Sequence, residues 1–271
     1  MAKEIRTVVV LSDLHAGSTV ALMPPEFTKA DEQTVKQNPL QAWYWQCWKR
    51  TLDWIDETVG DDPAALILNG DLIEGDHHRT TEIISRDIGD HIEMARIILT
   101  PLTIRFSKTF ITRGTECHTG NVEATLGKLL GSEINHENDR RVFDRLTLDI
   151  CGVRLVARHH VSTTSRPWLE SNGLGMELAS EQLSAVRNGE PMPKVLCVAH
   201  RHIGGHIVST EGVCLATPAW QGLTRHAHKV VPSARCKTGA YILDWRNTDN
   251  GQTPQIKRKF FEAPHAKVVK V

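Results

Sequence analysis

Two side chains that could bind a metal follow the first apolar run of the chain. Asp13 and His15 come directly after the run Thr7 to Ser12. That run is rich in β-branched residues and lacks alternation, which predicts a strand buried on both faces, as in parallel sheets covered by helices. Its carboxyl end is where open α/β sheets bind ligands, and side chains two apart on an extended segment point the same way. The alternative is a turn-capping Asp beside a surface His, so the pair alone is weak evidence for a metal site.

Four further groups of metal-binding residue types also follow predicted strands. They are Gly70-Asp71 after the run Ala64 to Leu68, Arg113 to His118 after Thr109 to Thr112, His159-His160 after Val153 to Ala157, and His200-Arg201-His202 after Val195 to Ala199. A right-handed parallel crossover places Asp71 beside Asp13 and His15 at the same sheet edge. Carboxylate and imidazole ligands suit Mn²⁺, Fe, Zn²⁺ or Ni²⁺, and the absence of thiolate ligands argues against a closed structural zinc site. The sequence therefore predicts an open metal site at which several strand ends converge.

Helices and strands must alternate to bring these strand ends together. Apolar residues at helical spacing predict helices at Leu40 to Val59, Ile84 to Leu99 (closed by Pro101), Val122 to Leu130 and Trp168 to Val186. The segment Ala16 to Pro39 has no period and is predicted to be a long loop over the site edge. From Val142 onward the period changes to two, which predicts a second sheet. We expect an α/β protein organised as a single domain over residues 1–271.

Charge and cysteine content limit the classes of function. The 271 residues include 32 basic and 32 acidic side chains, so no overall positive field attracts nucleic acid, and such a partner would need a local patch. Six cysteines without a CxxC pair suit reduced thiols better than a disulfide framework or a zinc ribbon. The first residues lack a signal-peptide pattern, and no stretch approaches the roughly 18 apolar residues of a membrane span. These features predict a cytoplasmic protein without a membrane partner.

Taken together and in this order, the five motifs resemble those of the calcineurin-like metallophosphoesterase superfamily, over roughly residues 8 to 202. The resemblance implies a four-layer α/β/β/α sandwich, in which two mixed sheets face each other between helices. It also implies a pair of divalent ions at the strand ends. The implied ligands are Asp13, His15 and His202 for the first ion, His159 (preferred to its neighbour His160) and His200 for the second ion, and Asp71 as the bridge between both.

The third motif departs from the family. Where the family has Gly-Asn-His-Asp/Glu, this chain has the sequence Gly-Thr-Glu-Cys-His. Thr115 stands at the position of the Asn that binds the second ion, and the nearest histidine is His118. Thr115, Glu116 or His118 could replace the Asn as a ligand, or His118 could be the general acid that protonates the leaving group. Arg113 could stabilise charge on the phosphorane, or could be a solvated loop residue. The spacing is similar to Gly-Thr-x-x-His variants among phage-type members.

The resemblance implies a dinuclear metal-dependent phosphoesterase, with Mn²⁺ as the favoured ion. Two ions about 3.5–4 Å apart can polarise a phosphoryl group and share a hydroxide that attacks phosphorus in line. The expected substrate is a phosphate ester, and a phosphodiester of the nuclease or nucleotide-diesterase type is favoured. The alternative is a non-catalytic regulatory or nucleic-acid-binding module that keeps metal but has lost turnover through the changed third motif. His77 and His78 could border the site but are favoured as solvated loop residues, and the oligomeric state is open.

Overall fold

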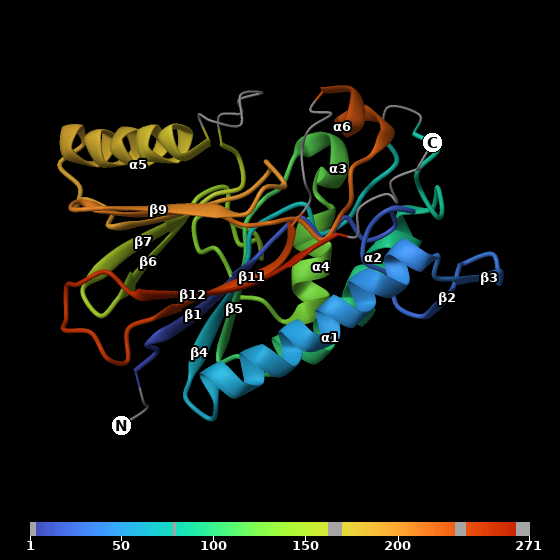
Figure 1. Ribbon diagram of the computed structural model, residues 1–271, viewed down its shortest axis with the longest axis horizontal. Coiled ribbons are helices and arrows are strands. Elements are labelled where there is room, and N and C mark those ends of the chain that lie inside the picture. Colours follow the sequence, from blue (N-terminus) through green and yellow to red (C-terminus); the bar gives the residue numbers. More distant parts are fainter. Residues whose placement is uncertain (1–3, 78–79, 162–169, 231–236, 264–271) are drawn as a thin grey trace, which may run out of the picture.

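The computed structural model describes residues 4–77, 80–161, 170–230 and 237–263 (Figure 1). One five-stranded sheet has the strand order β12-β11-β1-β4-β5. Its strands are β1 (Thr7–Leu11), β4 (Ala64–Leu68), β5 (Lys108–Ile111), β11 (Lys237–Asp244) and β12 (Gln255–Glu262). β1, β4 and β5 are parallel, whereas β11 and β12 are each antiparallel to a neighbour. The carboxyl ends of β1, β4 and β5 therefore meet at one edge, as the sequence predicts.

A second five-stranded sheet has the order β6-β7-β8-β10-β9. Its strands are β6 (Leu146–Ile150), β7 (Val153–Ala157), β8 (Val195–Val198), β9 (Gly205–Ser209) and β10 (Gly212–Ala216). β7, β8 and β10 run parallel, and β6 and β9 are antiparallel edge strands, so this sheet is also mixed. The histidine motifs after β7 and β8 leave the sheet at the same end.

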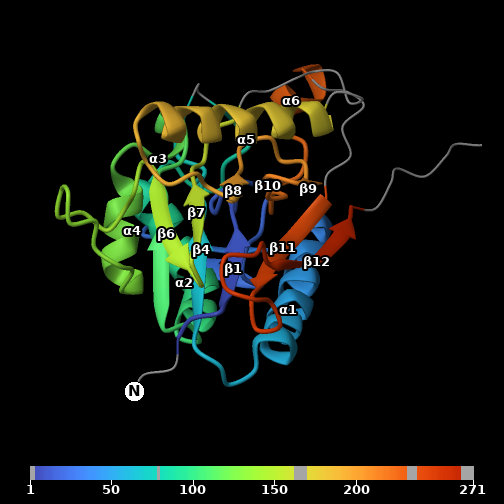
Figure 2. The same cartoon turned by 90° about the vertical axis from the view of Figure 1, so that its left-hand side faces the viewer.

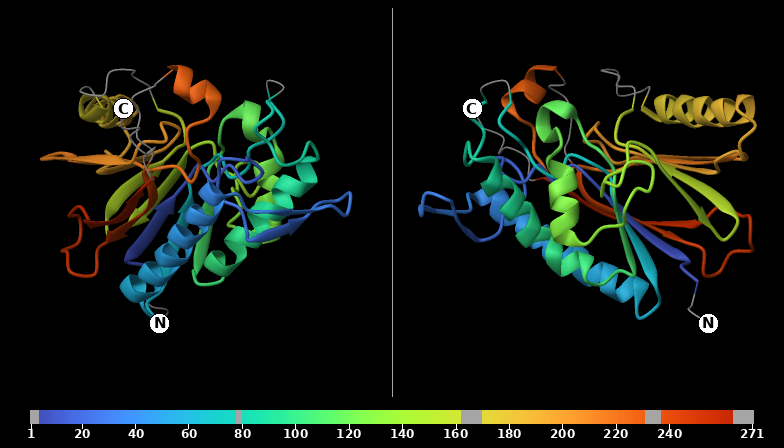
Figure 3. Two further views of the ribbon diagram at one scale, coloured as in Figure 1. Left: turned by 45° about the vertical axis from the view of Figure 1, so that its right-hand side comes forward. Right: turned by 180° about the vertical axis from the view of Figure 1, so that it is seen from behind.

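Helices cover the outer face of each sheet. The helices among the described residues are α1 (Pro39–Val59), α2 (Ile88–Thr103), α3 (Glu116–Thr119), α4 (Val122–Leu130), α5 (Glu170–Arg187) and α6 (Arg225–Val230). α1 and α2 lie against the first sheet, and α5 lies over the second sheet on the opposite side of the molecule (Figures 2 and 3). Within the described residues, no helix is both long and apolar enough to cross a membrane.

The apolar clusters confirm this layering. Val8 and Val10 of β1 join a cluster between the two sheets that also contains Leu155 of β7. Val9 and Leu11 alternate with them and pack on the other side, against α1 and α2. A third cluster joins α5 to the outer face of the second sheet. The predicted four-layer α/β/β/α sandwich of two facing mixed sheets is confirmed.

The predicted long loop after His15 contains regular structure. β2 (Glu26–Thr28) and β3 (Thr34–Lys36) form an antiparallel hairpin within it. These strands have three residues each and lack an apolar period long enough to predict them. The hairpin shortens the irregular part of the segment.

The predicted limits of the second helix are wrong at both ends. Ile84 is held outside the helix because its N–H donates to the carbonyl of Gly17 at 2.8 Å. Asp87 caps α2 by accepting from the N–H of Gly89, so the helix begins at Ile88. At the other end the helix contains Pro101 and continues to Thr103. Of the fourth predicted helix, Trp168 lies outside the described residues.

Candidate metal centre

The loops after β1 and β4 remain paired beyond the regular strands. Asp13 N–H donates to the Gly70 carbonyl at 2.9 Å, and His15 N–H donates to the Asp71 carbonyl at 3.0 Å. These hydrogen bonds extend the β1–β4 pairing through the first two motifs. Asp13, His15 and Asp71 are each no more than 1% exposed, so their polar side chains are turned into the protein.

The backbone at these residues is left-handed. φ is 52° at Asp13, 48° at His15, 50° at Asp71, 69° at His200 and 57° at His202. The predicted extended conformation, which explained why Asp13 and His15 point the same way, is therefore wrong. Their side chains converge because the chain turns sharply at each residue. This backbone region costs a non-glycine residue of order 1–3 kcal/mol, and such residues cluster at functional sites.

The residues predicted for the first ion lie together. Nε2 of His202 is 3.1 Å from Nε2 of His15 and 3.4 Å from Oδ1 of Asp13. Nε2 of His15 is 4.0 Å from the same Asp13 oxygen. One ion could therefore contact one atom from each of these three side chains.

The residues predicted for the second ion also lie together. Nδ1 of His159 donates to the Asn69 carbonyl at 2.7 Å, which turns Nε2 toward Oδ2 of Asp71 at 3.0 Å. His159, His160 and His200 bring ligand nitrogens within 4.8 Å of one another. His159 is 1% exposed, whereas His160 is exposed at the rim. This burial difference supports the preference for His159 over His160, although both roles stay predictions.

Two buried atoms of the cluster have unmet bonding capacity. Oδ1 of Asp13 and Nε2 of His159 lie 3.9 Å apart, and neither makes a hydrogen bond of normal geometry among the described residues, although each faces an oppositely charged group within 3.4 Å. An unsatisfied buried carboxylate oxygen or imidazole nitrogen is costly, since nothing replaces the water it has lost. Divalent ions bound here would satisfy both atoms. The donor set therefore fits a metal, and its oxygen and nitrogen ligands suit Mn²⁺, Fe or Zn²⁺.

The electrostatics of the metal-free cluster support the same conclusion. Burial alone would raise the pKa of Asp71, but its contact with His159 and the charges of His159 and His15 hold that pKa far below its usual value. Burial alone would lower the pKa of His159, but the Asp13 and Asp71 carboxylates raise it well above its usual value. A proton on His159 thus balances the two buried carboxylates. A bound cation would displace that proton and take over its role.

Thr115 of the third motif lies beside the predicted bridge. Its N–H donates to Oδ1 of Asp71 at 2.6 Å, and its hydroxyl donates to Oδ2 at 3.0 Å. The same hydroxyl oxygen is 3.2 Å from Nδ1 of His200. Thr115 is thus on the side of the second predicted ion, where the family places its Asn, whereas Glu116 is exposed on α3.

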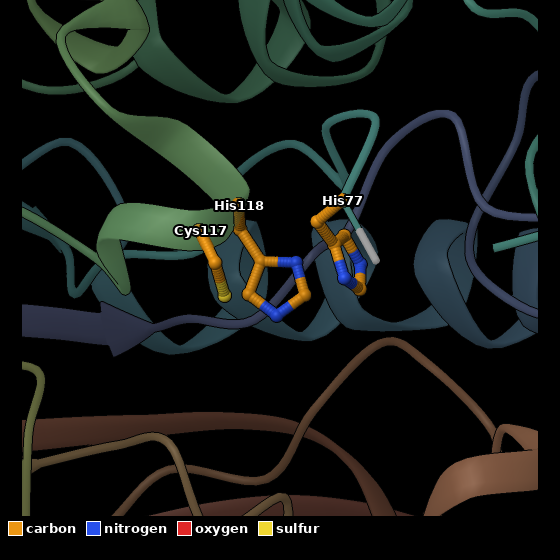
Figure 4. A group of neighbouring side chains, drawn as sticks. All are labelled: His77, Cys117 and His118. Atoms are coloured by element: carbon orange, nitrogen blue, oxygen red, sulfur yellow. The ribbon is translucent and has the colours of Figure 1, made fainter. Parts of the chain in front are cut away.

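His118 lies on the other side of the cluster, close to His15. Nδ1 of His118 donates to the carbonyl of Glu74 at 2.8 Å, and its ring stands edge-on to the ring of His15 at a centroid distance of 4.8 Å. Burial and the nearby His15 lower the pKa of His118 to about 4. Cys117 and His77 lie on either side of the His118 ring (Figure 4), and the three bring ligand-type atoms within 4.8 Å of one another. His78 lies outside the described residues.

Arg113 makes contacts away from the cluster. Its Nε donates to Asp144 at 2.5 Å and its Nη1 to the Gly120 carbonyl at 3.1 Å. The guanidinium therefore supports the end of the short helix α3. A direct role on a phosphoryl group stays a prediction that would require these contacts to break.

Sequence reasoning missed Glu74, which is 2% exposed. Its Oε2 lies 2.9 Å from Nδ1 of His15 and 2.7 Å from Nε2 of Gln221, and its Oε1 lies 3.0 Å from Nε2 of His77. Burial would raise the pKa of Glu74, but contacts with His15 and His77 hold it well below its usual value. The only sequence signal was an acidic residue soon after Asp71. Glu74 fixes the orientation of the His15 ring, as carboxylates behind metal-binding histidines commonly do.

Comparisons with known proteins concern the fold. The sequence matches no protein-family model and none of the curated proteins. Solved structures that match it include an archaeal phosphodiesterase, with 8% identity, a TM-score of 0.45, and coverage of 94% of this chain and 99% of that chain. Wild-type Vps29 complexed with Zn²⁺ from Entamoeba histolytica has 10% identity, a TM-score of 0.42, and coverage of 95% and 99%. Vacuolar protein sorting 29 from Cryptosporidium parvum has 12% identity, a TM-score of 0.43, and coverage of 96% and 100%.

Gly114 is a position where any side chain should disturb the cluster. A Cβ there would lie 2.3 Å from both N and Oδ1 of Asp71. We expect Gly114→Ala to weaken Mn²⁺ binding about 10- to 100-fold, the loss typical when groups that orient metal ligands are displaced. Titration calorimetry of the metal-free protein measures this. Gly205→Ala is the matched control, because a Cβ there meets nothing within 4 Å. Equal Mn²⁺ affinity in the two variants would contradict the prediction.

Glu74→Gln should weaken binding of the ion that His15 would hold. The amide removes the negative charge beside His15, and when its oxygen accepts from His15 and Gln221 its NH₂ faces His77. We expect a loss of Mn²⁺ affinity of about 10- to 100-fold in the same calorimetric titration. Glu93→Gln is the control, because Glu93 pairs with Arg96 on the surface of α2. An unchanged affinity in Glu74→Gln would show that the His15 ring needs no such support.

Proposed function

We propose that this chain is a dinuclear metal-dependent phosphoesterase. The observation that carries the proposal is the convergence of two groups of buried ligand-type side chains, at whose junction Asp13 Oδ1 and His159 Nε2 make no hydrogen bond of normal geometry. A structural role would not require a buried carboxylate oxygen and a buried imidazole nitrogen to lie 3.9 Å apart outside hydrogen-bond geometry. Manganese is the favoured ion, and the phage-type relationship and a cytoplasmic location remain predictions from the sequence.

In this proposal the ligands divide between two ions. Asp13, His15 and His202 would hold the first ion, His159, His200 and Thr115 would hold the second, and Asp71 would contribute to both. Bound divalent ions supply positive charge that polarises a phosphoryl group and lowers the pKa of attacking water. Asn69 and Glu74 keep the His159 and His15 rings oriented through Nδ1, which leaves each Nε2 available to a metal. His160 is exposed at the rim, where it would contact substrate or the second ion.

We assign the leaving-group proton to His118. A ring nitrogen of His118 lies within 4.8 Å of a His15 nitrogen and a Glu74 carboxylate oxygen, on the side of the first proposed ion, whereas the Asn of the family pattern would bind the second ion. Because Nδ1–H is held by the Glu74 carbonyl, Nε2 is the atom that exchanges the proton. A bound phosphate anion would raise the low pKa of this imidazole, since a negative charge favours the protonated form.

Hydrolysis of simple esters tests the proposed function. We expect the chelator-treated chain to be inactive and to regain activity with Mn²⁺, because the buried carboxylates cannot bind a phosphate ester without cations. Bis(p-nitrophenyl) phosphate and p-nitrophenyl phosphate, assayed side by side, report the expected preference for a diester. Turnover that persists in excess chelator would contradict the proposal. Two bound ions without turnover on either ester would favour the non-catalytic binding module instead.

His118→Ala separates the two roles open to this histidine. As a general acid it should contribute about 10²–10⁴-fold, and only for leaving groups that need a proton. We therefore expect the variant to keep both Mn²⁺ ions, to lose most activity on a methyl or other alkyl diester, and to lose little on a nitrophenyl diester. His228→Ala is the control, because His228 is exposed on α6. Loss of one metal equivalent with equal slowing of both esters would assign His118 as a ligand.

A further inference from the structure

Glu123 is a buried carboxylate that the proposed chemistry does not use. It lies in the first turn of α4 and is 0% exposed. Its Oε2 accepts from the N–H of Gly114 at 2.7 Å, and its Oε1 accepts from the N–H of Leu72 at 3.3 Å. Among the described residues, the hydrogen bonds of this carboxylate go to these two backbone groups.

These two backbone groups belong to the loops that carry the second and third motifs. Leu72 directly follows Asp71, and Gly114 directly precedes Thr115. The loops also meet on their other side, where Thr115 N–H donates to Oδ1 of Asp71 at 2.6 Å. Glu123 therefore closes a ring of hydrogen bonds in which each loop is held from two directions.

Burial makes a carboxylate energetically unfavourable at this position. Its neighbour on the same helix, Leu126, is also 0% exposed and packs in the apolar cluster under the first sheet. Burial, together with the negative charge of Asp71, raises the pKa of Glu123 to about 7. An apolar side chain would avoid this cost of desolvation. What the carboxylate adds is two acceptors on one rigid group, at the spacing of the two N–H donors.

We propose that Glu123 is a positioning residue, which fixes the separation of Asp71 and Thr115 by holding the backbone of both loops and thereby sets the affinity for the second ion. The inference rests on the proposed function in so far as Asp71 and Thr115 are taken as ligands. Among the described residues, Glu123 makes no hydrogen bond to either side chain and acts only through Leu72 and Gly114.

Substitution of Glu123 tests this role by metal binding alone. In Glu123→Gln a single oxygen can accept from Gly114, but the amide NH₂ then faces the Leu72 N–H, donor against donor. We expect one of two Mn²⁺ ions to bind about 10- to 100-fold more weakly in calorimetric titration of the metal-free protein, and the other to be little affected. Glu123→Asp keeps both acceptors on a shorter side chain, so it should show a smaller loss, and it replaces Glu123→Gln should that variant not fold.

Leu126→Ala is the control for simple loss of stability. It leaves a cavity one turn along the same helix and should lower the melting temperature of the metal-free protein at least as much as Glu123→Gln, but with unchanged Mn²⁺ affinity. Unchanged affinity in both Glu123 variants would overturn the proposal, and so would an equal loss in Leu126→Ala. These affinity measurements do not test catalysis. Wild-type protein that binds both ions without hydrolysing an ester would overturn the proposed function but leave the role of Glu123 intact.

Discussion

The burial of two carboxylates side by side is the constraint on which the rest of this structure depends. Asp13 and Asp71 are both almost completely buried, and each raises the other's cost of carrying charge. Histidine is the residue that can balance them in two ways: as a cation when protonated, or as a neutral ligand when a metal supplies the charge. His159 lies between the two carboxylates and fills the first role in the metal-free chain. A purely structural interior would have no reason to keep this arrangement, because replacing buried charges by apolar groups is often neutral or stabilising.

The residues that carry these charges have a strained, left-handed backbone conformation. The left-handed turns at Asp13 and Asp71 are stabilised on each side, by the continued pairing with the neighbouring loop and by the Trp220 N–H, which donates to the Asp13 carbonyl at 2.8 Å. Glycine gives the space that the cluster needs. A Cβ at Gly70 would lie 2.5 Å from Nδ1 of His159, where Gly70 itself has a φ of 81°. Strands β1 and β4 tolerate this strain because they are buried on both faces, between the helices and the second sheet.

The sequence predicts the layers and the candidate ligands because both depend on local patterns. Uninterrupted apolar runs such as Ala64–Leu68 identify buried parallel strands, and short polar motifs at their ends identify ligands in order along the chain. The contacts that orient those ligands depend instead on residues distant in sequence. Glu123 and Leu72 are 51 positions apart in the sequence, and Gln221 and Glu74 are 147 apart, so no spacing rule could have predicted these two contacts. The left-handed turns escaped prediction for a similar reason: Asp and His adopt that region more often than most residues, but still rarely, and only the tertiary pairing imposes it here.

In the altered third motif, one helical turn separates the residues proposed as metal ligand and general acid. In the family pattern the Asn and His are adjacent, whereas here Thr115 caps α3 and His118 lies three positions on, with its N–H donating to the Thr115 carbonyl at 3.0 Å. Residues three apart on a helical turn share a side, so both still face the cluster, but at different ends of it. Thr115 directs both its donors to Asp71 and offers only a hydroxyl oxygen in place of an amide oxygen. Under the proposed function, affinity for the second ion then depends more on the exact placement of Asp71 than on Thr115 as the replacement ligand. Glu123 meets this requirement, because its buried carboxylate ties the Asp71 loop to the Thr115 loop. The altered motif therefore gives a physical reason for the buried Glu123.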